Sequence, residues 1–324
     1  MDRKAFLAAL ALAVVTPGAW AQAPSWPDKP VKWVLSQPPG SGPDNVARLL
    51  SERLGRQWGQ AVVIDNKPGG QNVIGAQAAA RSPADGYSFY FATTAALVTN
   101  VYLFKQMPYD PQKDFVPVGF VARSPFGVLV RAESPLHTID ELIAKSKATP
   151  GTFSLGNEGP RTFGGMIARL LNARTKAEAN LVSYSSVSVS IQDLLGGHVE
   201  AIVADVASSA QLVKQGRLRL LAVTSAKRVP GFDSVPALAE RVLPGVEMVG
   251  WFAIVAPAGT PQPVIERVNR DLNALLADKD VAERIATIGP IADAGLTPEQ
   301  VGAFLRAEHA RWSVITKEIG VLPE

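Results

Sequence analysis

The sequence has no cysteine and only three histidines among its 324 residues. The lack of cysteine excludes disulfides, thiolate metal sites and a cysteine nucleophile. The histidines, His137, His198 and His309, are too far apart in the sequence for paired-histidine zinc patterns, so we expect no metal and no cofactor. Basic residues are scattered and the net charge is only +3, so the sequence gives no support for nucleic-acid binding.

Long hydrophobic runs are also scarce, and the one at the N-terminus is too short to span a bilayer. A charged start (Asp2-Arg3-Lys4) precedes the apolar run Ala5–Val15, and two overlapping small-residue sites end at Ala21 and Ala23. This order predicts a secretory signal peptide over residues 1–23, cleaved at either site. An exported chain without disulfides must be stabilised by its apolar core, which a chain of this length can build.

Apolar runs of strand length alternate with amphipathic helical segments along the rest of the chain. This pattern is typical of α/β domains with mostly parallel sheets. The runs Val116–Ala122 and Gly127–Arg131 are divided by only four residues, which indicates a crossing between two lobes, and Trp251–Ala256 is expected to return. We therefore predict a signal peptide at 1–23, lobe one from 24–124 with 249–324, and lobe two from 125–248.

The loop between the first strand, Val31–Leu35, and the helix Asn45–Trp58 is the most informative motif. It is rich in glycine and proline, and Ser41-Gly42-Pro43-Asp44 matches a helix start with Ser41 as N-cap. A helix N-terminus carries unpaired N–H donors and the positive end of the helix dipole, so this loop predicts an anion site. The alternative is an ordinary turn whose free amides face water.

The loops resemble one family across nearly the whole chain. The matching segments, in chain order, are Trp26–Pro30, Pro38–Asp44 with Ala47-Arg48, Asn66–Gly69, Ala84–Tyr87, Pro108–Pro111 with Lys113–Phe115, Asp193–Gly197, Ala222–Arg228, Trp251-Phe252 and Ala256–Pro261. Each segment alone is weak, but the whole set in this order is specific. The chain resembles the substrate-binding proteins of tripartite tricarboxylate transporters, also called Bug receptors after Bordetella uptake genes.

The resemblance implies a type II-like, two-lobed periplasmic binding protein of the α/β class, with two hinge crossings. Such a protein is not an enzyme: it captures a small carboxylate, closes, and is recognised by a membrane permease. We expect a monomer in the periplasm, with a dicarboxylate or tricarboxylate, an acidic amino acid or an aromatic acid as ligand. A sensory receptor that presents its ligand to a membrane signalling protein is an alternative. An exported hydrolase using Glu158 and Asp205 is a remote one.

The expected ligand-binding residues come from the loops that match the family. They are Pro39, Gly40, Ser41, Gly42, Asp44, Thr93, Thr94, Asn157, Arg161, Thr162, Tyr184, Ser185 and Asp205. Some interpretations stay open: Asp44 and Asp205 could cap helices instead, and Trp251 and Phe252 fit hinge packing better than ligand stacking.

Lobe two departs from the family pattern at residues 156–163. Arg161 could pair with a second carboxylate, Phe163 could pack on the ligand, and Glu158 could meet a ligand ammonium group. Alternatively, Glu158 and Arg161 pair with each other or face solvent.

Overall fold

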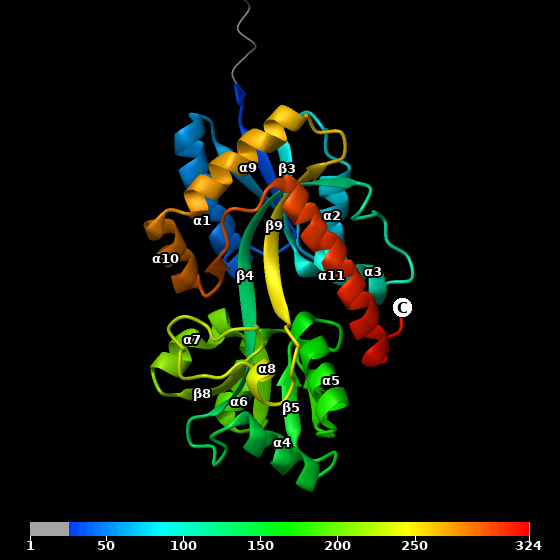
Figure 1. Cartoon of the computed structure of the whole chain (residues 1–324), viewed down its shortest axis with the longest axis vertical. Helices are drawn as coiled ribbons and strands as arrows, with labels where there is room; N and C mark the ends of the chain where they lie inside the picture. The colour runs from blue at the N-terminus through cyan, green and yellow to red at the C-terminus, as the bar shows by residue number, and fades with distance from the viewer. Residues whose placement is uncertain (1–25, 324) are drawn as a thin grey trace, which may run out of the picture.

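A computed structural model describes residues 26–323, so the predicted signal peptide lies outside the described residues. The chain forms two α/β lobes stacked along the long axis of the molecule and joined by two long strands, β4 and β9 (Figure 1). This confirms the predicted two-lobed fold. The predicted lobe boundaries, 24–124 with 249–324 and 125–248, remain a prediction. No helix within residues 26–323 has the length and apolarity needed to cross a membrane.

Lobe one is built on a sheet in which β1 is parallel to both β2 and β3, while β9 runs antiparallel to β3. Its core contains fully buried large side chains such as Trp33, Phe89 and Phe91, packed under α1, α9 and α10. Its elements are β1 (Val31–Leu35), α1 (Gly42–Trp58), β2 (Val62–Asn66), the 3₁₀ turn η1 (Gly70–Asn72), α2 (Val73–Ala80), β3 (Ser88–Thr93), the π-helical segment η2 (Ala95–Thr99), α3 (Asn100–Leu103), α9 (Gln262–Leu276), α10 (Lys279–Ile288), β10 (Ile291–Ala292) and α11 (Pro298–Glu318).

Lobe two has a smaller sheet in which β5 is parallel to β6 and β7. Its first helix begins at a capping box, where the Thr138 hydroxyl accepts from the Glu141 N–H and the Glu141 carboxylate accepts from the Thr138 N–H. Its elements are α4 (Ile139–Ala148), β5 (Ser154–Asn157), α5 (Phe163–Thr175), β6 (Asn180–Ser183), α6 (Val187–Gly196), β7 (Ala201–Asp205), α7 (Val206–Lys214), β8 (Leu218–Val223) and α8 (Leu238–Arg241).

The first crossing is one continuous strand, β4 (Phe115–Arg131), and not the two separate strands that the sequence suggested. Its first part, up to Pro125, pairs with β9 (Val249–Pro257), and its last part pairs with β7 and β8 of lobe two. The residues 123–126 therefore do not break the strand, because partner strands on the two sides supply hydrogen bonds along its length.

The C-terminal helix α11 belongs to lobe one in sequence but also reaches lobe two. In Figure 1 it descends beside the two crossing strands. Trp251 of β9 donates to the buried Glu308 carboxylate of α11 at 3.0 Å, and Trp312 of α11 packs on Phe163 of lobe two. One apolar core therefore continues from lobe one through Trp251 and Trp312 into lobe two.

Candidate ligand-binding site

A cleft of about 720 Å³ lies between the lobes, and we call it the main cleft. A smaller cavity of about 470 Å³, the side pocket, shares Pro38, Ser186, Val187 and Asp205 with it. Most of the loops that line the two follow the carboxyl ends of the parallel strands β1, β2, β3, β5, β6 and β7. Ligands of open α/β sheets bind at these strand ends. The fold thus brings loops far apart in sequence to one site.

The N-terminus of α1 opens onto the main cleft through Gly40, Ser41 and Gly42. Ser41 is the N-cap, as expected, but its hydroxyl donates to the Pro38 carbonyl at 2.8 Å and caps no helix amide. Within residues 26–323, no acceptor takes the N–H of Gly42. This helix start therefore keeps an N–H donor for a group in the cleft.

The buried Asp44 carboxylate holds this loop in place through hydrogen bonds. It is fully buried, and it accepts from the Gly40 N–H, the Arg48 guanidinium and the Asn66 amide, each at 2.8 Å. Burial opposes ionisation, but these hydrogen bonds outweigh it and hold the pKa of Asp44 below its usual range. Asp44 is not among the residues that line either cavity. Its place in the structure is that of a loop-fixing carboxylate.

Two neighbouring threonines, Thr93 at the end of β3 and Thr94 directly after it, lie at the main cleft. The Thr94 hydroxyl accepts from the Trp251 backbone N–H at 2.9 Å, which ties this loop to the crossing strand β9. The Thr93 hydroxyl lines the main cleft and is buried without a hydrogen-bond partner in the described structure. A buried polar atom without a partner is costly, so a ligand or an ordered water is expected to satisfy it.

On the lobe-two side, Glu158 and Asp205 both line the side pocket. One Glu158 oxygen accepts from the Gly164 N–H at 2.9 Å, and the other is buried without a partner. Asp205 caps α7 by accepting from the Ser208 N–H at 2.8 Å and from its hydroxyl. Burial raises the pKa of both carboxyls, and the Asp205 charge further raises the pKa of Glu158.

On the lobe-one side, the side pocket is bounded by Gln71 and Asn72, which have the left-handed φ values of 52° and 78°. Residues other than glycine seldom adopt this conformation, so the surroundings must hold it. The Asn100 amide donates to the Gln71 carbonyl at 2.7 Å, and the Ser36 hydroxyl donates to the Asn72 carbonyl at 3.1 Å. Gln37 gives its amide to Asn72, and its own carbonyl oxygen stays buried without a partner.

Of the predicted site residues, Gly40, Ser41, Gly42, Thr93, Thr94 and Asp205 line the main cleft, and Thr162, Ser185 and Asp205 line the side pocket. Pro39, Asp44, Asn157, Arg161 and Tyr184 line neither. Asn157 is buried, and its side-chain oxygen accepts from the Gly159 N–H at 2.9 Å, so it holds the loop after β5. Burial and Asp193 raise the pKa of Tyr184 to about 12.

Sequence reasoning did not place several lining residues in the site. Trp251 and Phe252, which the sequence favoured as hinge packing, also line the main cleft. Phe163, which the sequence offered as a possible ligand contact, lines it too. The remaining main-cleft residues that were not predicted are Pro38, Pro43, Asn45, Ala95, Ser124, Phe126, Ser186, Val187, Ser188, Ala207, Ser208, Gly250, Ile288 and Pro290. The serine-rich segment 183–188 could have indicated some of these residues. It follows a parallel strand, and ligands bind at the carboxyl ends of such strands.

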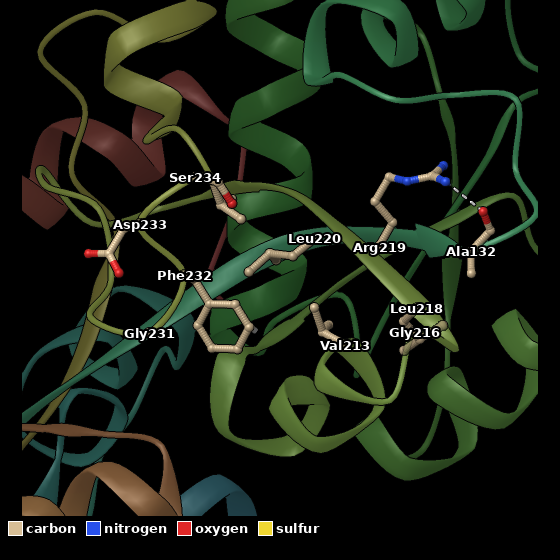
Figure 2. A pocket seen from close by; sticks show the side chains of 11 residues that line it. Ala132, Val213, Gly216, Leu218, Arg219, Leu220, Gly231, Phe232, Asp233 and Ser234 are labelled. Atoms are coloured by element: carbon tan, nitrogen blue, oxygen red, sulfur yellow. Dashed lines mark hydrogen bonds between the residues drawn. The ribbon is translucent and has the colours of Figure 1, made fainter.

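A separate hollow of about 630 Å³ lies on lobe two and shares no lining residue with the cleft (Figure 2). Its one basic side chain, Arg219, donates to the carbonyls of Ala132, Ser134 and Leu136 at 2.7–2.9 Å. Because the guanidinium is used by these carbonyls, the hollow offers no evident anion site. No group of residues arranged to hold a metal ion occurs within 26–323.

The model of the tripartite tricarboxylate transporter family receptor matches residues 46–321. The chain belongs to this receptor family.

Relatives of this receptor match over its whole length. A protein encoded between tcbD and tcbE of Pseudomonas sp. strain P51 is 35% identical, with 98% of this chain and 95% of that protein covered. Protein BugT of Bordetella pertussis is 33% identical, with 99% of each covered. Among solved structures, R. palustris Rpa4515 with adipate has a TM-score of 0.84 and 32% identity, covering 92% of this receptor and all of that chain.

Proposed function

We propose that this receptor works in the periplasm, where it captures a small carboxylate between its lobes and delivers it to a membrane permease. The observation that carries the proposal is the α1 N-terminus at the cleft, where the Gly42 N–H lacks an acceptor within the described residues. The Thr93 hydroxyl, buried without a partner there, is a second group for a carboxylate oxygen or its bridging water. A helix N-terminus attracts anions through its free amides and its dipole.

The composition of the cleft supports one particular way of holding the anion. Neither the main cleft nor the side pocket is lined by a lysine, arginine or histidine among residues 26–323. Backbone N–H groups, hydroxyls and ordered waters must then hold the carboxylate, and water-mediated contacts are nearly as favourable in enthalpy as direct ones. The adipate complex of the 32% identical relative supports a small carboxylate as ligand class.

The two crossing strands support a capture mechanism by lobe closure. A ligand that contacts both walls of the cleft favours the state in which the walls are close, because only that state makes both sets of contacts. β4 and β9 are the segments that absorb the rotation. A permease that recognises the closed shape then receives only loaded receptor, acting as a monomer.

A thermal-shift screen of ligand-free protein against small carboxylates tests this function. Ligand at 100 times its dissociation constant should add about 2.7 kcal/mol, which corresponds to a rise of several degrees in melting temperature. Uptake of the labelled ligand by cells with and without this gene then tests delivery to a permease. The protein should first be unfolded to release any bound ligand and then refolded. If no carboxylate stabilises this refolded protein, the proposal is contradicted. Binding without uptake would instead indicate a sensory receptor.

A further inference from the structure

The main cleft has an aromatic side. Four of its lining residues carry aromatic rings: Phe126 on β4, Phe163 at the start of α5, and Trp251 and Phe252 on β9. Trp251 and Phe252 are buried, with 1% and 7% of their surface exposed, whereas Phe126 and Phe163 are only half-buried. Phe126 and Phe163 are therefore the rings that keep surface for a molecule in the cleft.

These two half-buried rings, which we call the aromatic platform, are held in position by their neighbours. Their centroids lie 5.2 Å apart, and the Phe163 ring also lies 5.4 Å from the ring of the fully buried Trp312. The Phe126 backbone is held by Thr224, whose hydroxyl accepts from the Phe126 N–H at 3.0 Å and whose N–H donates to the Phe126 carbonyl at 2.9 Å. A ligand at the platform thus meets a surface that is already ordered, which lowers the entropy cost of binding.

The aromatic platform and the proposed carboxylate site belong to different lobes. The Gly42 N–H and the Thr93 hydroxyl come from lobe one. Phe163 begins a helix of lobe two, and Phe126 pairs with Asp205 at the end of β7. A ligand that contacts both sites bridges the lobes, and only the closed state makes both sets of contacts. The platform is therefore placed to supply the lobe-two contacts of a ligand whose carboxylate is held by lobe one.

The charges along the main cleft leave these lobe-two contacts to neutral groups. Asp205 is the only charged side chain among residues 26–323 that lines this cleft, and its oxygens accept from the Ser208 N–H and hydroxyl. The half-buried apolar side chains of the lining include the platform rings, Val187 and Ile288. Burial of apolar ligand surface against these groups favours binding, as in most small-molecule sites.

We propose that the aromatic platform binds the ring of an aromatic acid whose carboxylate lies at the α1 N-terminus. This inference rests on the proposed carboxylate-receptor function and narrows it to aromatic carboxylates. A flat ring can contact the Phe126 and Phe163 rings in an offset or edge-to-face arrangement, which a saturated ring or an open chain cannot. A ring also has fewer rotatable bonds than an open chain of equal carbon number, so it loses less entropy on binding. The receptor thus selects aromatic acids over aliphatic acids of similar size.

Matched pairs of acids test the inference by calorimetry on protein that has been unfolded, freed of ligand and refolded. Benzoate, phenylacetate and 3-phenylpropionate are each compared with the acid in which a cyclohexyl ring replaces the phenyl ring, and adipate is the open-chain reference. The phenyl acid of at least one pair should bind about threefold or more tighter than its cyclohexyl counterpart, and tighter than adipate. Equal or tighter binding by the cyclohexyl acid in every pair would overturn the inference. Tighter binding of adipate than of every phenyl acid would also overturn it.

Phe163→Leu separates recognition of the ring from packing, because leucine keeps an apolar side chain at this position. It should lower the affinity of the best phenyl acid about threefold or more, and change that of its cyclohexyl counterpart by less than about twofold. Phe126→Leu should act in the same direction, and it supplies the result if loss of the Trp312 contact prevents Phe163→Leu from folding. Phe232→Leu is the matched control and should change neither affinity. Phe232 is also a half-buried ring of lobe two, and it lines neither the main cleft nor the side pocket.

The outcomes distinguish this inference from the function on which it rests. A ratio of phenyl to cyclohexyl affinity that is unchanged in the folded leucine variants of Phe126 and Phe163 would overturn the platform while leaving the carboxylate receptor intact. Absence of binding by every phenyl acid, with binding of another carboxylate in the thermal-shift screen, would do the same. Absence of binding in both experiments would overturn the receptor function and the platform together.

Discussion

The rings of Phe163 and Trp312 lie with their centroids 5.4 Å apart, although one begins α5 of lobe two and the other belongs to α11 at the C-terminus. Phe163 also packs on Phe126 of the crossing strand at 5.2 Å and lines the main cleft. The Arg174 guanidinium and the Glu318 carboxylate join the same two helices at 2.9 Å. The wall of the cleft is therefore coupled to a helix on the outside of the other lobe.

Trp312→Ala should destabilise the whole protein. The Trp312 side chain is fully buried at the contact between α11 and lobe two, and removal of such a side chain costs about 3–5 kcal/mol. Urea unfolding measures the loss. Val314→Ala on the same helix is the control, because Val314 is 63% exposed and should change stability little. Equal stability of the two variants would mean that α11 is not anchored as described.

Gly42→Val should weaken carboxylate binding and leave the fold intact. A Cβ at Gly42 meets no heavy atom within 4 Å, so the folded chain accepts a side chain there. That side chain would project at the helix start that we propose as the anion seat, and it should lower affinity by about tenfold or more, that is 1.4 kcal/mol. Calorimetry with the best carboxylate measures the effect, and the melting temperature is the control. Unchanged affinity would remove this loop from the site.

Asp44→Asn should destabilise lobe one, because the asparagine cannot accept from all three of the donors that now bind Asp44. We expect a loss of about 1–3 kcal/mol at neutral pH. The pKa of Asp44 is lowered by folding, so its contribution is complete above the ordinary value of 3.8 and is lost as the pH falls through the folded value. Unfolding measured from neutral to acidic pH should therefore show the gap between wild type and variant closing. A constant gap would contradict this account.

Glu158→Gln should stabilise the ligand-free protein at neutral pH. Burial and Asp205 raise the pKa of Glu158, so its ionised form costs stability as the pH rises above the ordinary value of 4.5. Glutamine keeps an oxygen for the Gly164 N–H and removes the charge. We expect a melting temperature roughly 1–4 °C higher at neutral pH and no gain below the ordinary pKa. Glu133→Gln, exposed in the same lobe, should show no such pH-dependent gain.

Much of the fold could be predicted because local patterns decide local structure. β1 was predicted with the residue limits that it has, and Ser41 is the N-cap of α1 as expected. The misread joint at Arg123–Phe126 shows the limit of such patterns. A proline and two polar residues look like a break, and only pairing with β9, β7 and β8 makes β4 continuous.

The candidate site was predicted in part on both lobes, since Thr162, Ser185 and Asp205 of lobe two line its cavities along with the lobe-one loop. The glycine-rich loop before α1 has a helix-start pattern that depends only on local sequence, so Gly40, Ser41 and Gly42 could be found from the sequence. The outcome for Asp44 could not, because the same carboxylate suits a cap, a ligand contact or a buried brace. Its three donors include Asn66, which lies 22 residues away and reaches it only in the folded protein.

The sequence by itself determined the two-lobed α/β architecture, the family and the helix start at the cleft, since these depend on periodicity, turn chemistry and ordered motifs. Tertiary structure alone decided that Gln37 and Glu158 line one pocket, and that each keeps a buried oxygen without a partner among residues 26–323. It also placed Phe163 against Trp312, far away in the chain. The physical reason is that burial and hydrogen-bond satisfaction are properties of the packed chain, and no local segment encodes which donors and acceptors packing leaves unpaired.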